Sequence, residues 1–223
     1  MKYALTFLIF GILSIIFGWN LVIFRWLFLW TGVSFIIVGS AYGGIGSKVF
    51  GKKSNGTLNK WCLFLLLPYL LLTRIIWHIQ RSISKEDCCN EIAPGIWLGR
   101  RAFVNELPNN ISLIIDLTAE FSEPPNVISG KTYICLPTLD TSVPPDRVFQ
   151  KLIHTICSWN GNVYIHCALG YGRSATVAAG VLLAKGLVDN LNQAEKLLLT
   201  ARPQIKFSPA QKNMLKKFQL SLQ

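Results

Sequence analysis

The 223-residue sequence combines 51% hydrophobic residues and a mean hydropathy of +0.40 with a formal net charge of +11, which excludes one ordinary soluble domain. Its charge is segregated, because residues 1–85 hold nine Lys or Arg and no Asp or Glu, whereas residues 86–223 hold 13 basic and 11 acidic residues. The nearly neutral second part excludes a nucleic-acid partner, and the basic first part suits anionic lipid headgroups.

Residues 1–80 are expected to form a membrane region with helices at about 3–17, 21–38 and 61–79. A helix needs about 20 apolar residues to cross a bilayer, so the second and third stretches come close and the first is short. Gly18-Trp19-Asn20 indicates a turn, and Pro68 indicates a kink that membrane helices tolerate. We therefore expect two or three transmembrane helices and an integral protein of a cell or inner membrane.

Two questions about this region stay open at the level of sequence. A cleaved signal peptide competes for residues 1–18, although no small-residue cleavage site follows and more apolar sequence does. The side of the membrane that the remainder faces depends on the number of crossings. Three crossings separate Lys2 and the 48–60 loop from the remainder, and the answer inverts if the first stretch does not cross.

Residues 81–90 are expected to be a linker, and they contain the adjacent pair Cys88-Cys89. Six cysteines in a chain of this length do not by themselves indicate disulfides. Cys62, Cys135 and Cys157 fall in apolar stretches or predicted elements, where small buried side chains are expected. For the Cys88-Cys89 pair, redox or metal chemistry remains an alternative.

Residues 91–223 are expected to form one α/β domain, in which a central sheet is flanked by helices. The pattern predicts strands at about 92–99, 111–117, 131–137 and 163–165, and helices at about 146–159, 175–184, 193–200 and 209–220. Pro144 and Pro145 favour the start of the first of these helices, with Asp146 in its first turn.

The most informative stretch is His166–Ser174, HCALGYGRS, which lies between a β-branched run and a helix rich in small residues. Gly170 and Gly172 allow a tight loop whose backbone amides, with the helix N-terminus, form a cradle for a tetrahedral anion. Arg173 is able to hold two oxygens of that anion through its planar fork. The loop is thus expected to bind a phosphate group.

Cys167 opens this loop, and its chemistry follows from its position. Helix N-termini and neighbouring cations favour the thiolate of a cysteine, which is the reactive nucleophile. The same field that binds phosphate therefore favours attack on phosphorus. Ser174 is placed to donate a hydrogen bond to the sulfur when it leaves. No GxxxxGK[ST] pattern is present, which argues against a nucleotide-binding loop.

The spacing HCxxGxGRS resembles the signature of the Cys-based protein tyrosine phosphatase superfamily, and GYGRS resembles its dual-specificity branch. The similarity extends over about residues 91–220 and includes the RPxIxxSPxQ stretch. It implies a thiophosphate intermediate on Cys167, an orienting role for His166, and no metal or other cofactor. The phosphate-binding residues that it implies are Ala168, Leu169, Gly170, Tyr171, Gly172 and Arg173.

The resemblance also implies a general acid on a loop about thirty residues before the cysteine. Asp140 lies 27 residues before Cys167 and is the candidate, with Asp146 as the alternative. The acid protonates a leaving oxygen that departs poorly as an anion. Further candidates are Asp116 and Glu120, to buttress the loop or Arg173, and Gln211, to position water or to lie on a solvated helix face.

Together these features predict a membrane-anchored, Cys-dependent phosphomonoester phosphatase. The expected substrate is a phosphoprotein, at Tyr and at Ser or Thr, and the alternative is a membrane lipid monoester of the phosphatidylglycerophosphate type. The uncharged Ala168, Leu169 and Tyr171 disfavour a polyphosphorylated headgroup, whereas the anchor favours a lipid. A non-catalytic phosphate-binding adaptor is a third hypothesis, disfavoured because the Cys, the Arg and the acid are all present. The oligomeric state stays open.

Overall fold

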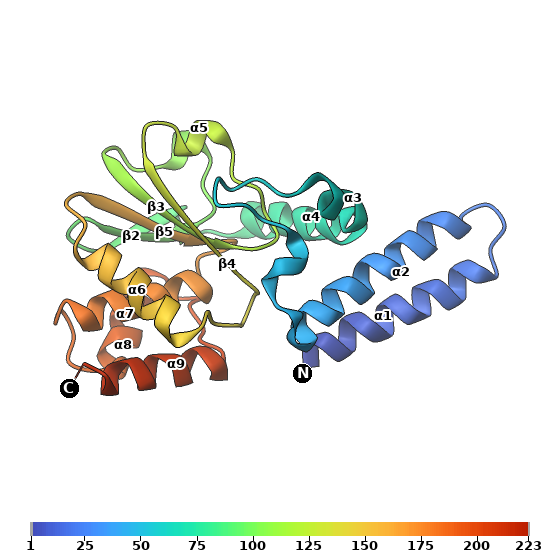
Figure 1. Cartoon of the computed structure of the whole chain (residues 1–223). Coiled ribbons are helices and arrows are strands. Elements are labelled where there is room, and N and C mark those ends of the chain that lie inside the picture. Colours follow the sequence, from blue (N-terminus) through green and yellow to red (C-terminus); the bar gives the residue numbers. More distant parts are fainter. Residues whose placement is uncertain (1, 223) are drawn as a thin grey trace. The chain divides into compact units, whose positions relative to one another are not determined.

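The computed structural model describes residues 2–222 and divides into two compact units. The first unit comprises the chain up to Ile83 together with Ala119–Ser122, and the second comprises Ser84–Thr118 and the chain from Glu123 onward. The boundary therefore lies at Ile83 and Ser84, inside the stretch expected to be a linker. Figure 1 shows the elements of both units and labels most of them.

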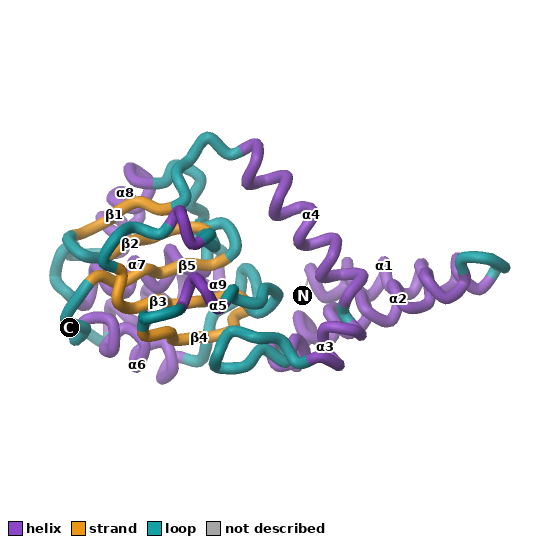
Figure 2. Tube along the Cα trace, turned by 90° about the horizontal axis from the view of Figure 1, so that it is seen from above, coloured by secondary structure: helices purple, strands orange, loops and turns teal. Residues whose placement is uncertain are grey.

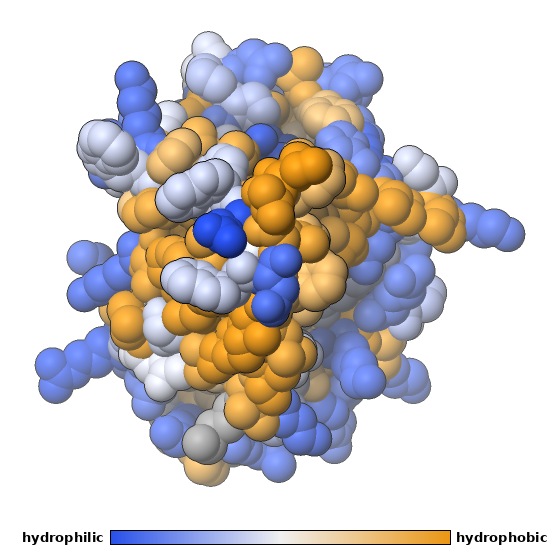
Figure 3. Space-filling model, turned by 90° about the vertical axis from the view of Figure 1, so that its right-hand side faces the viewer, coloured by the Kyte–Doolittle hydropathy of each residue, from blue (hydrophilic) through white to orange (hydrophobic). Residues whose placement is uncertain are grey.

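The first unit begins with a hairpin of two apolar helices, α1 (Lys2–Trp19) and α2 (Arg25–Ser40), the second continued by a π-turn η1 (Ala41–Ile45) (Figure 1). The helical segments Lys2–Trp19 and Arg25–Ile45 have 18 and 21 residues, and both are long and apolar enough to cross a membrane. At about 1.5 Å per residue they extend about 27 and 31 Å, close to the thickness of a hydrocarbon core. Figure 3 views the hairpin from its turn and shows the apolar surface gathered over it.

Glycines allow the two helices of the hairpin to approach closely. A Cβ atom added to Gly11 would lie 2.8 Å from the carbonyl oxygen of Gly32, and one added to Gly32 would lie 2.7 Å from that of Gly11. Gly39 is similarly restricted, since its Cβ would lie 2.8 Å from Leu8. Small residues at a helix–helix contact are the usual means of close packing inside membranes.

The helix expected at 61–79 is interrupted in the structure. A 3₁₀ turn η2 (Ser47–Phe50) and a loop lead into α3 (Lys60–Leu65), and α4 (Leu67–Ile83) follows after a break at Leu66. Pro68 has no N–H for the carbonyl of Phe64, which instead accepts a hydrogen bond of 3.1 Å from Trp30 Nε1. Among the described residues, neither α3 nor α4 is long enough to count as a candidate membrane span.

The second unit contains a five-stranded sheet in the order β1-β2-β5-β3-β4. Its strands are β1 (Cys89–Ala93), β2 (Ile96–Arg100), β3 (Ile111–Thr118), β4 (Thr132–Thr138) and β5 (Asn162–Cys167). All neighbouring strands are parallel except β1 and β2, which pair as an antiparallel hairpin. The single strand expected at 92–99 is thus two strands, joined by a turn at Gly95 with φ +75°. Strand β5 lies at the centre of the sheet, between β2 and β3, and is parallel to both (Figure 2).

The helices of this unit are α5 (Pro125–Ile128), α6 (Asp146–Cys157), α7 (Arg173–Ala184), α8 (Leu191–Ala201) and α9 (Pro209–Leu220), with a 3₁₀ turn η3 (Val104–Glu106). The helices α6 to α9 lie on one face of the sheet and the short α5 lies on the other (Figures 1 and 2). The predicted α/β class, a central sheet flanked by helices, is confirmed. The elements that the sequence did not predict, η3 and α5, have only three and four residues.

The alternation of side chains along β5 positions the end of the strand. Val163, Ile165 and Cys167 belong to the main core beneath α6 to α9, whereas Tyr164 belongs to the smaller core on the opposite face. Since successive strand residues point to opposite faces, His166 shares the face of Tyr164, on which its ring stacks at 5.4 Å between centroids. The strand therefore directs Cys167 and His166 into two different environments.

Candidate active site

The sulfur of Cys167 lies in a tight loop between the end of β5 and the start of α7. The Cys167 residue is 3% exposed, and its Sγ accepts a hydrogen bond of 3.3 Å from the backbone N–H of Gly170. The hydroxyl oxygen of Ser174 lies 3.2 Å from the same sulfur. A backbone N–H and a hydroxyl directed at sulfur both stabilise negative charge on it. The motif thus places donors around the candidate nucleophile, as a thiolate requires.

Only one of the two loop glycines is demanded by the backbone. Gly170 has φ +84°, and a Cβ atom on it would lie 2.6 Å from the carbonyl carbon of Gly99 in β2. Gly172 has φ −118°, and a Cβ there would lie 3.4 Å from the Gln211 side chain, an ordinary contact. The turn therefore requires glycine at position 170, as the sequence predicted, whereas position 172 would accept a side chain.

Arg173 and Asp140 lie together beside the loop. The Arg173 residue is 4% exposed, and its Nη1 donates a hydrogen bond of 2.9 Å to the carbonyl of Thr138 at the end of β4. Its Nε lies 3.4 Å from Oδ1 of Asp140, whose side chain is 63% exposed. The guanidinium is therefore held in place by buried backbone, while the carboxylate is at the surface, where it is accessible to a substrate.

These groups line one cavity of about 180 Å³, whose lining residues are Asp140, Thr141, Cys167, Ala168, Leu169, Tyr171, Gly172, Arg173, Lys206 and Gln211. Eight of them are candidate site residues predicted from the sequence, and Thr141 and Lys206 are not. The alternative acid, Asp146, is not among them. It lies in the first turn of α6, with Lys217 Nζ 3.7 Å from its carboxylate.

The loop that carries Asp140 is attached to the N-terminus of α9. Thr141 has an unusual positive φ of 60°, and its carbonyl accepts a hydrogen bond of 2.7 Å from Ser208 Oγ. The neighbouring carbonyl of Ser142 accepts one of 3.5 Å from Gln211 Nε2. A non-glycine residue in the left-handed region is strained and persists where its surroundings hold it. Contacts from α9 thus place the candidate acid over the cavity.

Gln211 is a correction to the sequence analysis. A solvated helix face had been one expectation for it, but the residue is 1% exposed and lines the cavity. Its Oε1 accepts a hydrogen bond of 2.8 Å from the backbone N–H of Ser208, and its own N–H donates to Ser208 Oγ. This reciprocal pair is a capping box at the start of α9, so the side chain supports the acid loop.

On the opposite face of β5, His166 lies beside two buried carboxylates. Asp116 is its register partner on β3, and one ligating atom each of Asp116, Glu123 and His166 lie within 4.8 Å of one another. The Nδ1 atom of His166 is 3.4 Å from the carbonyl oxygen of Cys167, while its Nε2 has no hydrogen-bond partner. The imidazole therefore contacts the backbone of the nucleophile and stands near two buried carboxylates.

The two carboxylates already have donors. Asp116 accepts hydrogen bonds from the N–H and hydroxyl of Thr118, at 2.8 and 2.7 Å, and from the hydroxyl of Tyr133 at 2.6 Å. Burial and the neighbouring Asp116 raise the pKa of Tyr133, which keeps that donor protonated. Glu123 pairs with Arg101 at 3.1 Å. A metal ion here would compete with these donors, so the two carboxylates are better described as hydrogen-bonded and ion-paired groups that lie beside His166.

Glu120, the other candidate for a buttress, has a different position. It is 8% exposed, it belongs to the segment grouped with the first unit, and it accepts a hydrogen bond of 2.9 Å from the N–H of Ala119.

The Cys88-Cys89 pair lies near η3, with Cys88 Sγ 3.7 Å from Glu106 Oε2. The hydrogen bond between the two thiols lowers the pKa of Cys88 and raises that of Cys89.

Sequence reasoning missed Arg202, which supports the phosphate loop from outside the cavity. The residue is fully buried, and its Nη2 donates a hydrogen bond of 3.3 Å to the carbonyl of Leu169. Its guanidinium lies over the ring of Tyr171, 5.4 Å from the centroid. It also forms an ion pair of 3.2 Å with Glu86, ahead of β1, and donates a hydrogen bond of 2.7 Å to Asn90 Oδ1 in β1. The RPxIxxSPxQ stretch was the available signal, but it carried no distance information.

Lys206, also missed, is an exposed cation at the mouth of the cavity. Its backbone N–H donates a hydrogen bond of 3.2 Å to the carbonyl of Tyr171, which fixes this segment beside the loop. Lys206 stands at an unspecified position of the RPxIxxSPxQ stretch, 39 residues beyond Cys167, so the motif did not single it out.

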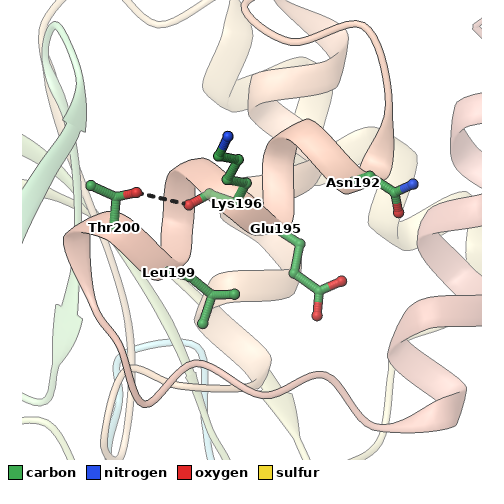
Figure 4. Close-up of a pocket in the computed structure, with 5 residues that line it drawn as sticks. All are labelled: Asn192, Glu195, Lys196, Leu199 and Thr200. Atoms are coloured by element: carbon green, nitrogen blue, oxygen red, sulfur yellow. Dashed lines mark hydrogen bonds between the residues drawn. The ribbon is translucent and has the colours of Figure 1, made fainter.

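A larger hollow of about 420 Å³ lies over α8 (Figure 4). It is lined by five residues of that one helix, Asn192, Glu195, Lys196, Leu199 and Thr200, and it is open to solvent. Its Glu195 is engaged with Lys212 at 3.1 Å. The smaller cavity is the better candidate site, because it alone of the two contains the cysteine, the arginine and the carboxylate together.

Comparison with known proteins agrees with this geometry. The sequence profile described as "Dual specificity phosphatase, catalytic domain" matches residues 102–221. Among solved structures, the chain is similar to PTPMT1 in complex with PI(5)P, with 23% identity, a TM-score of 0.55, and coverage of 61% of this chain and 97% of that one. The chain is also similar to Tk-PTP in the active form, with 20% identity, a TM-score of 0.55, and coverage of 60% of this chain and 97% of that one. For the human tyrosine phosphatase-like serine/threonine/tyrosine-interacting protein, the identity is 22%, the TM-score is 0.53, and the coverage is 60% of this chain and 96% of that one.

Replacing the sulfur should separate binding from chemistry. We expect Cys167→Ser to lower turnover of an aryl phosphate by more than about 10³-fold, as removal of other covalent nucleophiles does. Binding of tungstate should persist, because the cradle consists of backbone amides and Arg173. Both are measured on the same preparation, by steady-state hydrolysis and by calorimetry. Turnover within tenfold of the natural protein would contradict a nucleophilic role for Cys167.

The role of Asp140 is tested by the leaving group. Asp140→Asn should lower turnover of a poor leaving group, such as an alkyl phosphate, by about 10²–10⁴-fold. The loss should shrink for a nitrophenyl phosphate, because its phenolate leaves without a proton. Asp146→Asn is the matched control and should change neither rate. Equal losses on both substrates would show that Asp140 has only a structural role.

The buried pair of Arg202 and Glu86 should contribute strongly to stability. Arg202→Met leaves Glu86 as an uncompensated, largely buried charge, which costs about 3–5 kcal/mol of the free energy of unfolding. Lys212→Met is the control, because it breaks an exposed pair with Glu195 and should cost less than about 1 kcal/mol. Urea unfolding measures both variants. A similar small loss in both would refute the role assigned to Arg202.

Proposed function

The chain belongs to the dual specificity phosphatase family, and on this basis we propose a membrane-anchored phosphatase that hydrolyses phosphate monoesters of proteins, at Tyr and at Ser or Thr. It is a Cys-based phosphatase. The observation that carries the proposal is the meeting of Cys167, Arg173 and Asp140 in one cavity. A non-catalytic adaptor has less support, because all three groups are present and adjacent.

In the first step the sulfur of Cys167 attacks phosphorus and forms an S–P bond, while the P–O bond to the leaving group breaks. Arg173 and the loop amides hold the equatorial oxygens, where charge must be stabilised. The carboxyl group of Asp140 gives its proton to the departing oxygen, so an alcohol or phenol is released. The products of this step are a thiophosphate on Cys167 and the ionised Asp140.

In the second step water attacks the thiophosphate and the S–P bond breaks. Asp140 accepts a proton from the attacking water, which restores the acid for the next cycle. The sulfur leaves as a thiolate, and the two hydrogen-bond donors around it, the N–H of Gly170 and the hydroxyl of Ser174, stabilise the charge that it regains. Inorganic phosphate is released, and no electrons are gained or lost.

The choice of a protein substrate follows from the floor of the cavity. Ala168, Leu169 and Tyr171 add no charge to the loop, so Arg173 is the cation that the loop itself brings to the scissile phosphate. A site of this kind suits a single phosphate on an otherwise variable side chain. The exposed position of Asp140 at the rim is compatible with both alkyl and aryl leaving groups.

A second candidate substrate is a phospholipid monoester, and two observations favour it. Lys206 places a further cation at the mouth of the cavity, where a second anionic group of a headgroup would lie. The apolar hairpin of α1 and α2, proposed as the membrane anchor, would confine the enzyme to the surface that carries such lipids. Confinement raises the effective concentration of substrate without new contacts.

One experiment distinguishes the two substrates. The full chain in vesicles is assayed on phosphotyrosine and phosphothreonine peptides and on phosphatidylglycerophosphate, for the natural protein and for Lys206→Ala. We expect higher kcat/KM on the peptides, and a change of less than about twofold on them in the variant. On the lipid, Lys206→Ala should lower kcat/KM about 2–5-fold, because it removes one exposed charge.

Lys196→Ala on α8 is the control for a general loss of positive charge, because Lys196 lies in the hollow away from the cavity. Hydrolysis of the lipid alone, with the peptides untouched, would replace the protein substrate with the lipid one. Hydrolysis of neither, together with unchanged nitrophenyl phosphate turnover, would exclude both substrates.

A further inference from the structure

Helix α4 is apolar on two opposite faces, and only one of them is packed within the described structure. Leu70 and Trp77 are 1% and 3% exposed on the inner face. The other face carries six aliphatic residues that are 43–73% exposed, Leu71, Leu72, Ile75, Ile76, Ile79 and Ile83. Because they follow one another at spacings of one, three and four residues, they form a single stripe along the helix.

Helix α4 carries basic residues and no acidic ones. Arg74 and Arg81 lie on it, the guanidinium of Arg81 5.3 Å from the ring centroid of Trp77 on the inner face, and no Asp or Glu precedes Glu86 in the sequence. An unpartnered apolar face on a helix that also carries cations is typical of a helix lying in the interface of an anionic bilayer. A protein partner would need an apolar surface for the stripe and acidic groups for the cations. An anionic lipid surface supplies both, through its acyl chains and its headgroups.

The start of α3 is bound to one end of the hairpin. The end of α3 and the start of α4 pack along α2, where Trp30 Nε1 donates a hydrogen bond of 3.1 Å to the carbonyl of Phe64 and the N–H of Tyr69 donates one of 3.4 Å to Ser34 Oγ. The N–H of Asn59 donates to the carbonyl of Gly51, just beyond the end of α2, at 2.9 Å. The ring of Tyr69 lies 5.7 Å from that of Phe7, near the beginning of α1, and 5.9 Å from that of Phe50. This end of the hairpin holds both the beginning of α1 and the end of α2. The segment after α2 thus begins on the side of the chain's N-terminus.

Basic residues are concentrated at the same end. Of the nine Lys and Arg residues in residues 1–85, only Arg25 lies beside the turn between α1 and α2. The other eight lie at the opposite end of the hairpin or in the segments after it, and they are Lys2, Lys48, Lys52, Lys53, Lys60, Arg74, Arg81 and Lys85. Loops rich in Lys and Arg remain on the cytoplasmic side of a membrane. The asymmetry therefore assigns the turn to the far side, and the other end of the hairpin, with the 46–60 segment, to the cytoplasmic side.

We propose that the chain crosses the membrane only twice, through α1 and α2, and that α4 lies in the plane of the cytoplasmic leaflet with its stripe on anionic lipid. The proposal rests on the membrane anchor of the proposed function and adds its topology and a lipid-docking surface. It places Cys167 in a reducing compartment, where a reactive thiol persists. Only residues 84–88 separate α4 from β1.

The number of crossings is tested with the full chain in a bacterial inner membrane. A reporter that is active only outside the cytoplasm is fused after the C-terminal residue, and in separate chains within the 52–58 loop and the 20–24 turn. We expect activity from the turn alone. Activity from the C-terminal fusion, with silence from the 52–58 loop, would show that α3 and α4 cross together and would overturn the proposal.

The docking of α4 is tested by photocrosslinking in the same membranes. A benzophenone amino acid is placed at Ile75 or Ile79 in the stripe, or at Gln80 as the exposed control on the same helix. We expect adducts with phospholipid at the two stripe positions and at least about fivefold fewer at Gln80. Protein adducts in place of lipid at Ile75 and Ile79 would refute the lipid surface even if the topology holds.

A matched charge variant gives a second readout for docking. Ile79→Asp places an acid in the stripe, and Gln80→Asp places the same charge beside it. We expect only the first to lower lipid adducts at Ile75, while turnover of nitrophenyl phosphate stays unchanged in both. Equal adducts in the two variants would count against docking. Release of the natural protein from membranes by alkaline carbonate would instead refute the anchor itself, so the two failures are distinguishable.

Discussion

The close approach of Gly170 to the backbone of Gly99 is the constraint on which the site depends. It forces the loop after β5 into a turn so tight that the N–H of Gly170 reaches the sulfur of Cys167 at 3.3 Å. The approach is possible because β2 and β5 pair in parallel and bring the two glycines to the same edge of the sheet. Any side chain at position 170 would separate the strand from the loop and remove a donor from the nucleophile.

Around this turn, support comes from three directions that are remote in sequence. Arg202 holds the carbonyl of Leu169 from one side, and the N-terminus of α9 holds the acid loop from another. On the third side His166 contacts the backbone of Cys167 and stands above the network of Asp116 and Glu123. Because each support is largely buried, the loop is preorganised, and little structure needs to be rearranged when phosphate binds.

The first unit, proposed as the membrane anchor, would separate location from chemistry. Its glycines allow close helix packing, its cations would contact the lipid surface in the proposed topology, and its described residues do not line the candidate active-site cavity. The charge segregation seen in the sequence acquires a physical explanation from the proposed topology, since one end of a two-helix hairpin and an interfacial helix both require cations on the same side. The nearly neutral phosphatase unit is thereby left free to meet substrates of either charge.

The α/β class was predictable from the sequence, and so were Cys167 and Arg173 as the candidate nucleophile and anion-binding residue, because periodicity and motif are local and the whole loop lies within nine residues. Asp140 needed the family's spacing, and its pairing with Arg173 at 3.4 Å appears only in the structure. Arg202, Lys206 and the buried Gln211 were missed or misplaced, since their contacts bridge more than 30 residues of chain. The break before α4 likewise depended on Trp30, which occupies the carbonyl that Pro68 cannot serve. Local patterns determine elements and motifs, whereas the partners of buried polar groups are decided only when distant segments pack together.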